Sequence, residues 1–408
     1  MESKKREIVV VGGGPAGLIA AKTAAEKDVD VLLFESKDKI GFHEHCAGLL
    51  SIKGLKSLNL SSIPSDIFQN KEIIGARLYS PSGKLIEVQK KEPTACVVNR
   101  VKFNLFLSSL AEKAGVDIET SSRVIDIKRK NSLLELNLGK KNSFEKINSK
   151  ITILAEGRFP KLNNKVGLPI PSRKRMIYTS QYYMSNVSGI DKQYVELYQT
   201  KEYAPGFFAW IIPINEETAK VGLGSNSIPA SKQLNFFIKK HPIAKKKLNK
   251  SEINKKSSGA IPIGSYISRT FTDNILVVGD AASQTKPTTG GGVILGGIAA
   301  QIAGDVAANA IKSENLSRKY LSNYSKLWKK EMKRNLSIMR QVRLYLNSLN
   351  NKEIEKLFTV INEPKLQPIF TEFGDVDEQK TIVFRLLLYY KLWPFLLKTG
   401  MKYLFTRK

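Results

Sequence analysis

The stretch that decides the fold is IVVVGGGPAG, residues 8–17. Its apolar, β-branched first half predicts a buried strand, which breaks into the pattern G-x-G-x-x-G. Each glycine of the pattern has a physical reason. Gly12 permits the tight turn after the strand, Gly14 lets the backbone approach a pyrophosphate, and Gly17 lets the next helix pack closely on the sheet.

The residues that follow complete a dinucleotide-binding unit. A helix is predicted over residues 15–27, with its N-terminal N–H groups and dipole facing phosphate. A second strand, residues 29–34, ends at Glu35, eighteen residues beyond Gly17. A carboxylate at this place accepts hydrogen bonds from a ribose hydroxyl pair. A glycine pattern alone would leave an unrelated turn open, but these elements in this order predict dinucleotide binding.

A second motif near the other end of the chain fits the first. It reads ILVVGDAA over residues 275–282 and is followed by PTTGGG over residues 287–292. An apolar helix is predicted directly after it, over residues 293–310. The N–H groups of Gly292 and Val293, at the start of that helix, would stabilise negative charge on the pyrimidine end of a reduced flavin. The two motifs together predict the two ends of one FAD.

Composition limits the class of protein and its partners. A chain of 408 residues with 42% hydrophobic content is long enough for two domains, or for one domain with a large insertion. The polar N-terminus indicates no signal peptide, and two cysteines, Cys46 and Cys96, indicate a reducing compartment. The net charge of +28 predicts attraction to a polyanion. No nucleic-acid module is visible, so two interpretations stay open: a solvated basic surface or an anionic membrane partner.

The order of the predicted elements indicates an α/β fold, with a Rossmann-type FAD-binding domain, an inserted antiparallel-sheet substrate domain and a helical C-terminal region. Substrate-domain strands are expected over residues 178–187, 194–198, 207–212 and 219–224. Two further strands, 124–128 and 133–138, are expected in a small sheet beside the cofactor, and a parallel strand over 151–155. The predicted segments are 1–72, 99–170 and 269–312 for the FAD-binding domain, 73–98 and 171–268 for the substrate domain, and 313–408 for the basic helical region.

Two more segments narrow the assignment. Residues 41–48 read GFHEHCAG, and residues 205–213 read PGFFAWIIP. With the two flavin motifs, they make the chain resemble the geranylgeranyl reductase family of FAD proteins, within the superfamily that includes the aromatic hydroxylases. The second segment is similar to the family's P-x-x-Y-x-W-x-F-P stretch, with Phe208 in place of the tyrosine and Ile212 in place of the second aromatic residue.

The resemblance implies a set of FAD contacts. Some of them are the contacts already expected from the two glycine motifs, at Gly12, Gly14, Gly17, Gly292 and Val293. The others are Ala16 and Glu35 at the pyrophosphate and adenosine ribose, Cys46, Ala47 and Gly48 beside the flavin, Arg100 along the dinucleotide, Val124 at the adenine and Asp280 at the ribityl chain.

A metal site is the competing interpretation of the cysteine segment. His43, His45 and Cys46 are all ligand types, but three ligands within four residues rarely suit tetrahedral geometry and no fourth lies nearby. No metal is therefore predicted. Cys96 lies in an apolar stretch and is expected in the core.

The aromatic segment is expected to face the substrate. Pro205, Gly206 and Pro213 bracket it, which favours an exposed, shaped surface that lines a substrate tunnel. Reduction of an isolated double bond needs a proton as well as a hydride, so carbocation character must be tolerated in a dry aromatic site. Trp210 and Phe208 suit that role. Cys46 is the third candidate catalytic residue, and the proton donor is not identified.

The tail indicates where the protein works. Residues 381–408 mix aromatic residues, leucines and lysines, with no uninterrupted apolar run long enough to span a bilayer. This mixture is typical of an interfacial helix, and the alternative is a core helix packed on its own domain. We expect peripheral binding at the cytoplasmic face of the cell membrane.

These observations lead to one function and three alternatives. The expected activity is an FAD-dependent reductase that saturates isolated C=C bonds of geranylgeranyl chains in ether lipids or their precursors. Its expected electron donor is ferredoxin or NAD(P)H, and no nucleic acid is expected as a partner. The alternatives are an FAD monooxygenase, a non-redox flavoprotein isoprenoid cyclase and a lipid carrier with a vestigial cofactor.

Overall fold

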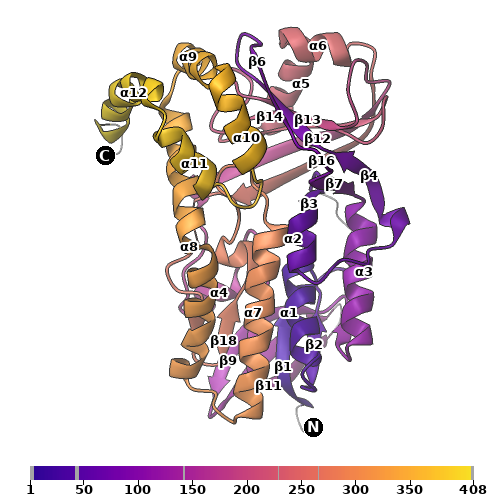
Figure 1. The fold of residues 1–408 in the computed structure, drawn as a ribbon. Helices are drawn as coiled ribbons and strands as arrows, with labels where there is room; N and C mark the ends of the chain where they lie inside the picture. Colours follow the sequence, from indigo (N-terminus) through magenta and orange to yellow (C-terminus); the bar gives the residue numbers. More distant parts are fainter. Residues whose placement is uncertain (1–3, 42–45, 141–142, 228, 265, 406–408) are drawn as a thin grey trace.

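The structure is a computed structural model that describes residues 4–41, 46–140, 143–227, 229–264 and 266–405. The molecule is elongated (Figure 1), with the nucleotide-binding motif in one half and a second sheet lying across the other. The C-terminal helices pack beside that second sheet and along the body. The α/β fold class expected from the sequence is confirmed.

The first sheet has eight strands, and its centre is parallel: β1 and β18 both pair with β11, and β2 pairs with β1 and β8. β11 is much longer than the predicted strand over 151–155, because its polar first half pairs with β10 as well as with β1. The predicted strands at 124–128 and 133–138 therefore extend this sheet instead of forming a separate one. The strands are β1 (Lys4–Val11), β2 (Val31–Phe34), β8 (Asp117–Glu119), β9 (Arg123–Lys130), β10 (Leu133–Lys140), β11 (Ser143–Leu154), β17 (Phe271–Thr272) and β18 (Ile275–Val277).

Helices pack closely on this sheet because their facing residues are small. A Cβ on Gly304 of α7 would lie 2.4 Å from the carbonyl oxygen of Ala20 in α1, so the two backbones meet there. Among the described residues, α7 is the one helix long and apolar enough to cross a membrane, but 72% of its most apolar window is buried. It packs against α1 and α8 as a core helix. The layer contains α1 (Pro15–Ala25), α3 (Arg100–Lys113), α7 (Val293–Lys312) and α8 (Arg318–Ser348).

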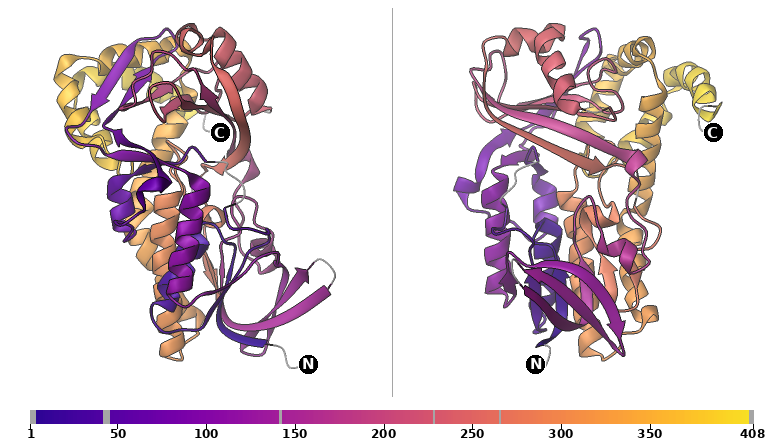
Figure 2. Two further views of the ribbon diagram at one scale, coloured as in Figure 1. Left: turned by 90° about the vertical axis from the view of Figure 1, so that its right-hand side faces the viewer. Right: turned by 180° about the vertical axis from the view of Figure 1, so that it is seen from behind.

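The second sheet has seven strands in the order β16-β12-β15-β14-β13-β5-β6. Seen from behind in Figure 2, it lies across the top of the body. The strands expected from apolar alternation are present, but β16 was not predicted, because its first half is polar and exposed. The strands are β5 (Gly75–Tyr79), β6 (Leu85–Gln89), β12 (Met176–Ser185), β13 (Tyr194–Tyr198), β14 (Ala209–Pro213), β15 (Ala219–Ser225) and β16 (Glu252–Pro262). Helices α5 (Ala230–Lys240) and α6 (Pro242–Leu248) accompany it.

A small sheet joins the two halves and was not predicted, because its strands are short and distant in sequence. Its strands are β3 (Leu49–Ser51), β4 (Phe68–Ile73) and β7 (Ala95–Val98). Short helices lie at the connections. They are α2 (Ile52–Ser57), η1 (Ser65–Ile67), α4 (Leu162–Lys165), η2 (Arg173–Arg175) and η3 (Gly279–Ala282).

The chain beyond Leu316 is helical, as its pattern predicts. The helices after α8 are α9 (Asn351–Ile361), η4 (Pro364–Leu366), α10 (Gln367–Phe373), α11 (Lys380–Leu387), η5 (Tyr390–Leu392) and α12 (Trp393–Phe405). The long α8 runs along the body (Figure 1), α9 and α10 pack against β6, and α11 and α12 contact α8.

Candidate active site

The two glycine motifs meet in space. The strands before them, β1 and β18, both pair with β11 in parallel, so their carboxyl ends lie at one edge of the sheet. Gly279 has a φ of +67°, and a Cβ there would lie 2.8 Å from the Cβ of Ala16. The turn after β1 is tight: a Cβ on Gly17 would lie 1.9 Å from the carbonyl oxygen of Gly12. Two segments more than 260 residues apart therefore meet at one edge of the sheet.

The first turn leaves room for a ligand. A Cβ on Gly14 would meet nothing within 4 Å, and Gly14 precedes α1 without a side-chain cap. The N–H groups at the start of α1 therefore face open space. Glu35 lies at the end of β2, where its carboxylate accepts hydrogen bonds from the N–H groups of Gly13 and Lys37, both at 2.8 Å.

Val124 lies beside Glu35 at the same edge. The N–H of Ser122 donates to the carbonyl oxygen of Glu35 at 3.0 Å, and Val124 follows it in β9, buried. Glu35 and Val124, both predicted to contact the adenosine, thus lie near each other.

Two guanidinium groups, of Arg100 and Arg158, lie close enough to the carboxylate of Asp280 to interact with its charge. Arg100 opens α3 and is 7% exposed, yet its Nε and Nη1 have no hydrogen-bond partner among the described residues. The buried Nε of Arg158, in the loop after β11, also has no partner among the described residues. Burial raises the pKa of Asp280, and the charges of Arg158 and Arg100 oppose that rise. Buried donors without partners are costly, so this group is built for an anionic or polar ligand.

The loop of residues 286–292, called the glycine loop below, curls before α7. The N–H of Lys286 donates to the carbonyl oxygen of Gly291 at 3.0 Å, and the N–H of Gly290 donates to that of Lys286 at 2.8 Å. Gly290 has a φ of +74°, and Gly292 precedes Val293, the first residue of α7, without a side-chain cap. The buried hydroxyl groups of Thr288 and Thr289 have no partner among the described residues.

Arg343 of α8 binds backbone carbonyl groups of the glycine loop. Its Nε donates to the carbonyl oxygen of Pro287 at 3.2 Å, and its Nη2 donates to that of Thr288. The guanidinium lies 4.5 Å from the centre of the Phe207 ring. Burial lowers the pKa of Arg343 to about 10. A buried cation thus links the C-terminal helix, the glycine loop and the aromatic segment.

Residues 41–48 are called the cysteine loop below. Within its described part, residues 46–48 lie against β7 and β15. Gly48 has a φ of +77°, and a Cβ there would lie 2.4 Å from the carbonyl oxygen of Val98. The half-buried Cys46 accepts a hydrogen bond at Sγ from the N–H of Gly48 at 3.4 Å. The buried Lys220 of β15 donates from Nζ to the carbonyl oxygen of Ala47 at 3.0 Å.

Two residues of the metal interpretation, His43 and His45, lie outside the described residues. Within the described ranges, no group of three or more His, Cys, Asp or Glu side chains is placed to hold a metal ion. Cys96 lies in the core at 1% exposure, and burial raises its pKa to about 12.

The aromatic segment is buried, so the expectation of an exposed surface was wrong. Phe207, Phe208 and Trp210, called the aromatic wall below, are 4%, 6% and 8% exposed. The rings of Phe207 and Phe208 stack at 4.2 Å, and Trp210 meets Phe208 edge-on at 6.0 Å. Glycines make room for them: a Cβ on Gly222 would lie 2.6 Å from Trp210, and one on Gly224 would lie 2.5 Å from Phe207. Sequence alone did not show that these glycines lie on β15, beside the strand that carries Trp210.

The aromatic wall adjoins both the glycine loop and the cysteine loop. Ala47 packs against the apolar cluster that contains Phe208 and Trp210. A Cβ on Gly290 would lie 3.4 Å from the Phe207 ring. Trp210 donates from Nε1 to Oε1 of Gln181 at 3.1 Å, which satisfies its one polar atom. The segments that carry the three candidate catalytic residues, Cys46, Phe208 and Trp210, are therefore neighbours in the fold.

Comparison with known proteins identifies the family. Three family models match parts of the chain: the geranylgeranyl reductase catalytic domain over residues 176–260, FAD dependent oxidoreductase over 7–157, and lycopene cyclase protein over 232–378. The digeranylgeranylglycerophospholipid reductase 1 of Methanosphaera stadtmanae is 32% identical over 370 residues, 90% of each chain. The digeranylgeranylglycerophospholipid reductase of Methanocaldococcus jannaschii is 32% identical over 360 residues, 88% of this chain and 90% of its own. The chain belongs to the geranylgeranyl reductase family. It is an FAD-dependent oxidoreductase, as the motifs predict.

Solved structures agree with this assignment. A geranylgeranyl bacteriochlorophyll reductase-like protein from Thermoplasma acidophilum is 26% identical, has a TM-score of 0.87, and covers 97% of this chain and 100% of its own. The p-nitrophenol 4-monooxygenase of Pseudomonas putida is 15% identical with a TM-score of 0.69, covers 92% of this chain and 100% of its own, and shares the fold alone. The fold is thus common to several chemistries, and the reductase assignment rests on the closer relatives.

The residues of this geranylgeranyl reductase fit FAD. Open space over Gly14 and the start of α1 suits a pyrophosphate. The unpartnered N–H groups of Arg100 and Arg158 supply donors along it. The hydroxyl groups of Thr288 and Thr289 lie at the glycine loop, where a flavin ring offers polar edges. These Arg and Thr donors have no hydrogen-bond partner within the described ranges, and the cofactor would provide one.

Three basic residues of the site were not predicted from the sequence. Arg158 follows the EG pair shortly after the parallel strand β11, and this position was the available signal. Lys220 and Arg343 had no signal, because the partners of each are backbone carbonyl groups distant in sequence.

Proposed function

We propose that this reductase saturates the isolated double bonds of geranylgeranyl chains on a glycerophospholipid. The names of its relatives motivate the lipid. One observation carries the chemistry: the aromatic wall lies against both the glycine loop and the cysteine loop. A prenyl chain held on this wall has its double bonds beside the flavin and away from water.

The chemistry of an isolated double bond explains the composition of the site. Such a bond is not an electrophile, so a proton must arrive before or together with hydride. When bound, reduced FAD supplies the hydride. The ring faces of Trp210 and Phe208 stabilise the tertiary carbocation character on the substrate without trapping it. Cys46 borders the same space, where its side chain shapes access to the reacting carbon.

The test is mass spectrometry of a geranylgeranylated glycerophospholipid incubated with the purified holoprotein under chemical reduction. The expected product gains one H2 per double bond. The gain should be lost in Trp210→Ala and reduced in Cys46→Ala. It should persist in Cys96→Ala, which removes the thiol buried outside the site.

Other products would identify the alternatives. Unchanged mass with altered retention indicates cyclisation, the reaction class suggested by the lycopene cyclase match over residues 232–378. Hydroxylated product with consumption of oxygen and NADPH indicates a monooxygenase, and unaltered lipid indicates a carrier.

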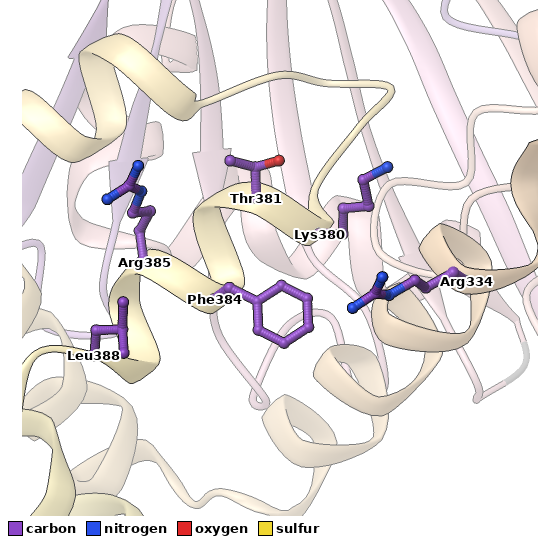
Figure 3. Close-up of a pocket in the computed structure, with 6 residues that line it drawn as sticks. All are labelled: Arg334, Lys380, Thr381, Phe384, Arg385 and Leu388. Atoms are coloured by element: carbon purple, nitrogen blue, oxygen red, sulfur yellow. The ribbon is translucent and has the colours of Figure 1, made fainter.

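The C-terminal helices form the membrane-binding surface of this proposal. A cavity of about 240 Å³ between α8 and α11 is lined by Arg334, Lys380, Arg385 and the exposed Phe384. In Figure 3 the Phe384 ring points toward Arg334, whose guanidinium lies 5.4 Å from the centre of the ring. Apolar side chains continue the surface along α11 and α12. They are Leu387, Leu388, Tyr390, Trp393 and Leu397, each at least 45% exposed. Apolar side chains rimmed by cations suit the interface of an anionic bilayer at the cytoplasmic face.

Two classes of electron donor suit the proposed reaction. The net charge of +28 favours an acidic carrier protein such as ferredoxin, and NAD(P)H is the other class. Anaerobic mixing of the oxidised holoprotein with reduced ferredoxin, NADPH or NADH, followed by loss of flavin absorbance, identifies the donor.

A further inference from the structure

A loop from the C-terminal region reaches the flavin site. Residues 374–379 connect α10 to α11 and approach the upper end of α7 (Figure 1). The loop is shaped by Asp375, whose Oδ1 accepts hydrogen bonds from the N–H groups of Asp377 and Glu378 at 2.7 and 3.0 Å. Asn335 of α8 fixes it from the other side, by donating to the carbonyl oxygen of Asp377 at 2.6 Å.

Asp377 makes a buried ion pair with the glycine loop. Its Oδ1 lies 2.7 Å from Nζ of Lys286, and the two side chains are 15% and 7% exposed. The same ammonium donates to the carbonyl oxygen of Val376 at 3.2 Å. Lys286 is the residue whose backbone closes the glycine loop onto Gly290 and Gly291.

The second oxygen of Asp377 reaches β3, the strand that directly follows the cysteine loop. Its Oδ2 accepts a hydrogen bond from Oγ of Ser51, three residues beyond Gly48 in the strand that follows the cysteine loop. Ser51 also caps α2 by accepting from the N–H of Gly54 at 2.9 Å. A Cβ on Gly54 would lie 2.7 Å from Ile294, in the first turn of α7. One carboxylate thus joins the two segments that border the flavin.

We propose that Asp377 is a positioning residue of the flavin site, supplied by the C-terminal region. It holds the glycine loop and the cysteine loop at the separation that the isoalloxazine needs. A buried ammonium that loses its counter-charge is strongly disfavoured, so without the carboxylate the Lys286 side chain would move and carry the glycine loop with it.

The test compares Asp377→Asn with Asp375→Asn. The control lies in the same loop, and its amide oxygen can keep the turn while losing the exposed pair with Lys53. FAD dissociation constants and the alkylation rate of Cys46 in the holoprotein are measured well below the unfolding temperature. In D377N, we expect the dissociation constant to rise about tenfold and Cys46 to react several times faster. Asp377→Glu should recover most of the affinity, and D375N should stay within about twofold of the parent.

Equal FAD affinity and equal Cys46 reactivity in D377N and the parent protein would overturn the proposal. An equal loss in D377N and D375N would do the same, because it would reflect general loosening of the loop. Should D377N not fold, Asp377→Ser against Asp375→Ser replaces it. Serine at 375 can still accept from the turn N–H groups, whereas serine at 377 removes the counter-charge, so about a tenfold difference in the FAD dissociation constant is expected. The readouts require no lipid, so the result is independent of the substrate proposed above.

Discussion

At Gly14 the protein itself imposes no need for glycine. Its dihedral angles, φ −76° and ψ 173°, suit any residue, and a Cβ would meet nothing within 4 Å. The requirement comes from the cofactor, which must approach the backbone there. Gly17 is the opposite case, since its Cβ would lie 1.9 Å from the carbonyl oxygen of Gly12 in the protein alone. Two glycines of one motif therefore have separable roles.

This difference gives a prediction for Gly14→Val. The free energy of unfolding of the apoprotein should stay within about 0.5 kcal/mol of the parent, while FAD affinity falls at least about tenfold, or ~1.4 kcal/mol. Urea unfolding and FAD titration measure the two effects. Gly17→Ala is the matched comparison and should lose stability before any cofactor is added. Parental FAD affinity in Gly14→Val would place the pyrophosphate elsewhere.

The two thiols differ enough to be told apart by reaction. Cys96 is 1% exposed with its pKa raised to about 12 by burial, whereas Cys46 is half-buried at the flavin loop. We predict that one thiol, Cys46, reacts with iodoacetamide in the native apoprotein, and that bound FAD slows this reaction. Peptide mapping after alkylation locates the label. Labelling of Cys96 in the native protein would contradict the buried position of β7.

At the scale of elements, α6 depends on one buried imidazole. Nδ1 of His241 accepts a hydrogen bond from the N–H of Ala244 at 3.3 Å, and its ring packs on Tyr198, Tyr203 and Phe237. The residue is 1% exposed. Burial lowers its pKa from 6.5 to about 4. The native fold therefore holds this imidazole neutral under conditions where the unfolded chain protonates it.

The sign of the pH dependence follows from that shift. As pH falls, the unfolded chain binds the proton first, so the stability due to neutral His241 is complete above about pH 6.5 and is lost towards pH 4. The loss should be on the order of 3 kcal/mol. Urea unfolding at pH 7 and pH 4.5 measures it. His241→Asn, which keeps a cap acceptor, should show a smaller loss, and an identical loss in both proteins would rule out His241 as the cause.

At the scale of the whole molecule, the proposed membrane binding combines the net charge with the C-terminal apolar residues. The charge of +28 attracts the chain to an anionic surface, and Leu388 and Trp393, 75% and 56% exposed, are available for insertion. Figure 1 places α12 at the outer end of the molecule, away from the nucleotide-binding sheet. In this arrangement the helices proposed to contact the membrane lie apart from the sheet that carries the nucleotide-binding motif.

Vesicle binding tests this arrangement. Leu388→Glu combined with Trp393→Glu should lower the partition coefficient onto anionic vesicles at least about tenfold, because each side chain would lose ~1.5 kcal/mol or more of apolar burial. Leu105→Glu changes a leucine that is 49% exposed on α3 and should have no such effect. Added salt should weaken the binding of the parent protein. If the double variant and Leu105→Glu had equal partition coefficients, the membrane contact would lie elsewhere.

Local sequence determined the parts of this protein that depend on backbone geometry. The turn at Gly12 with its φ of +113° and the close approach at Gly17 demand glycine wherever they occur, so the motif and its cofactor could be inferred without the fold. Strands with apolar alternation and the C-terminal helices were also predicted, because the spacing of their apolar residues is itself a local pattern. Strand β16 and the length of β11 were not, because their polar residues become strand only by pairing with neighbours.

The tertiary structure alone decided how the site is closed. The aromatic wall is buried because Gly222 and Gly224, on a different strand, leave space for its rings. Arg343 and Asp377 belong to the site because the C-terminal helices return to it, over 50 residues in sequence from the carbonyl and ammonium groups they bind. Contacts over such separations depend on how whole elements pack, and neither local propensity nor a motif records them.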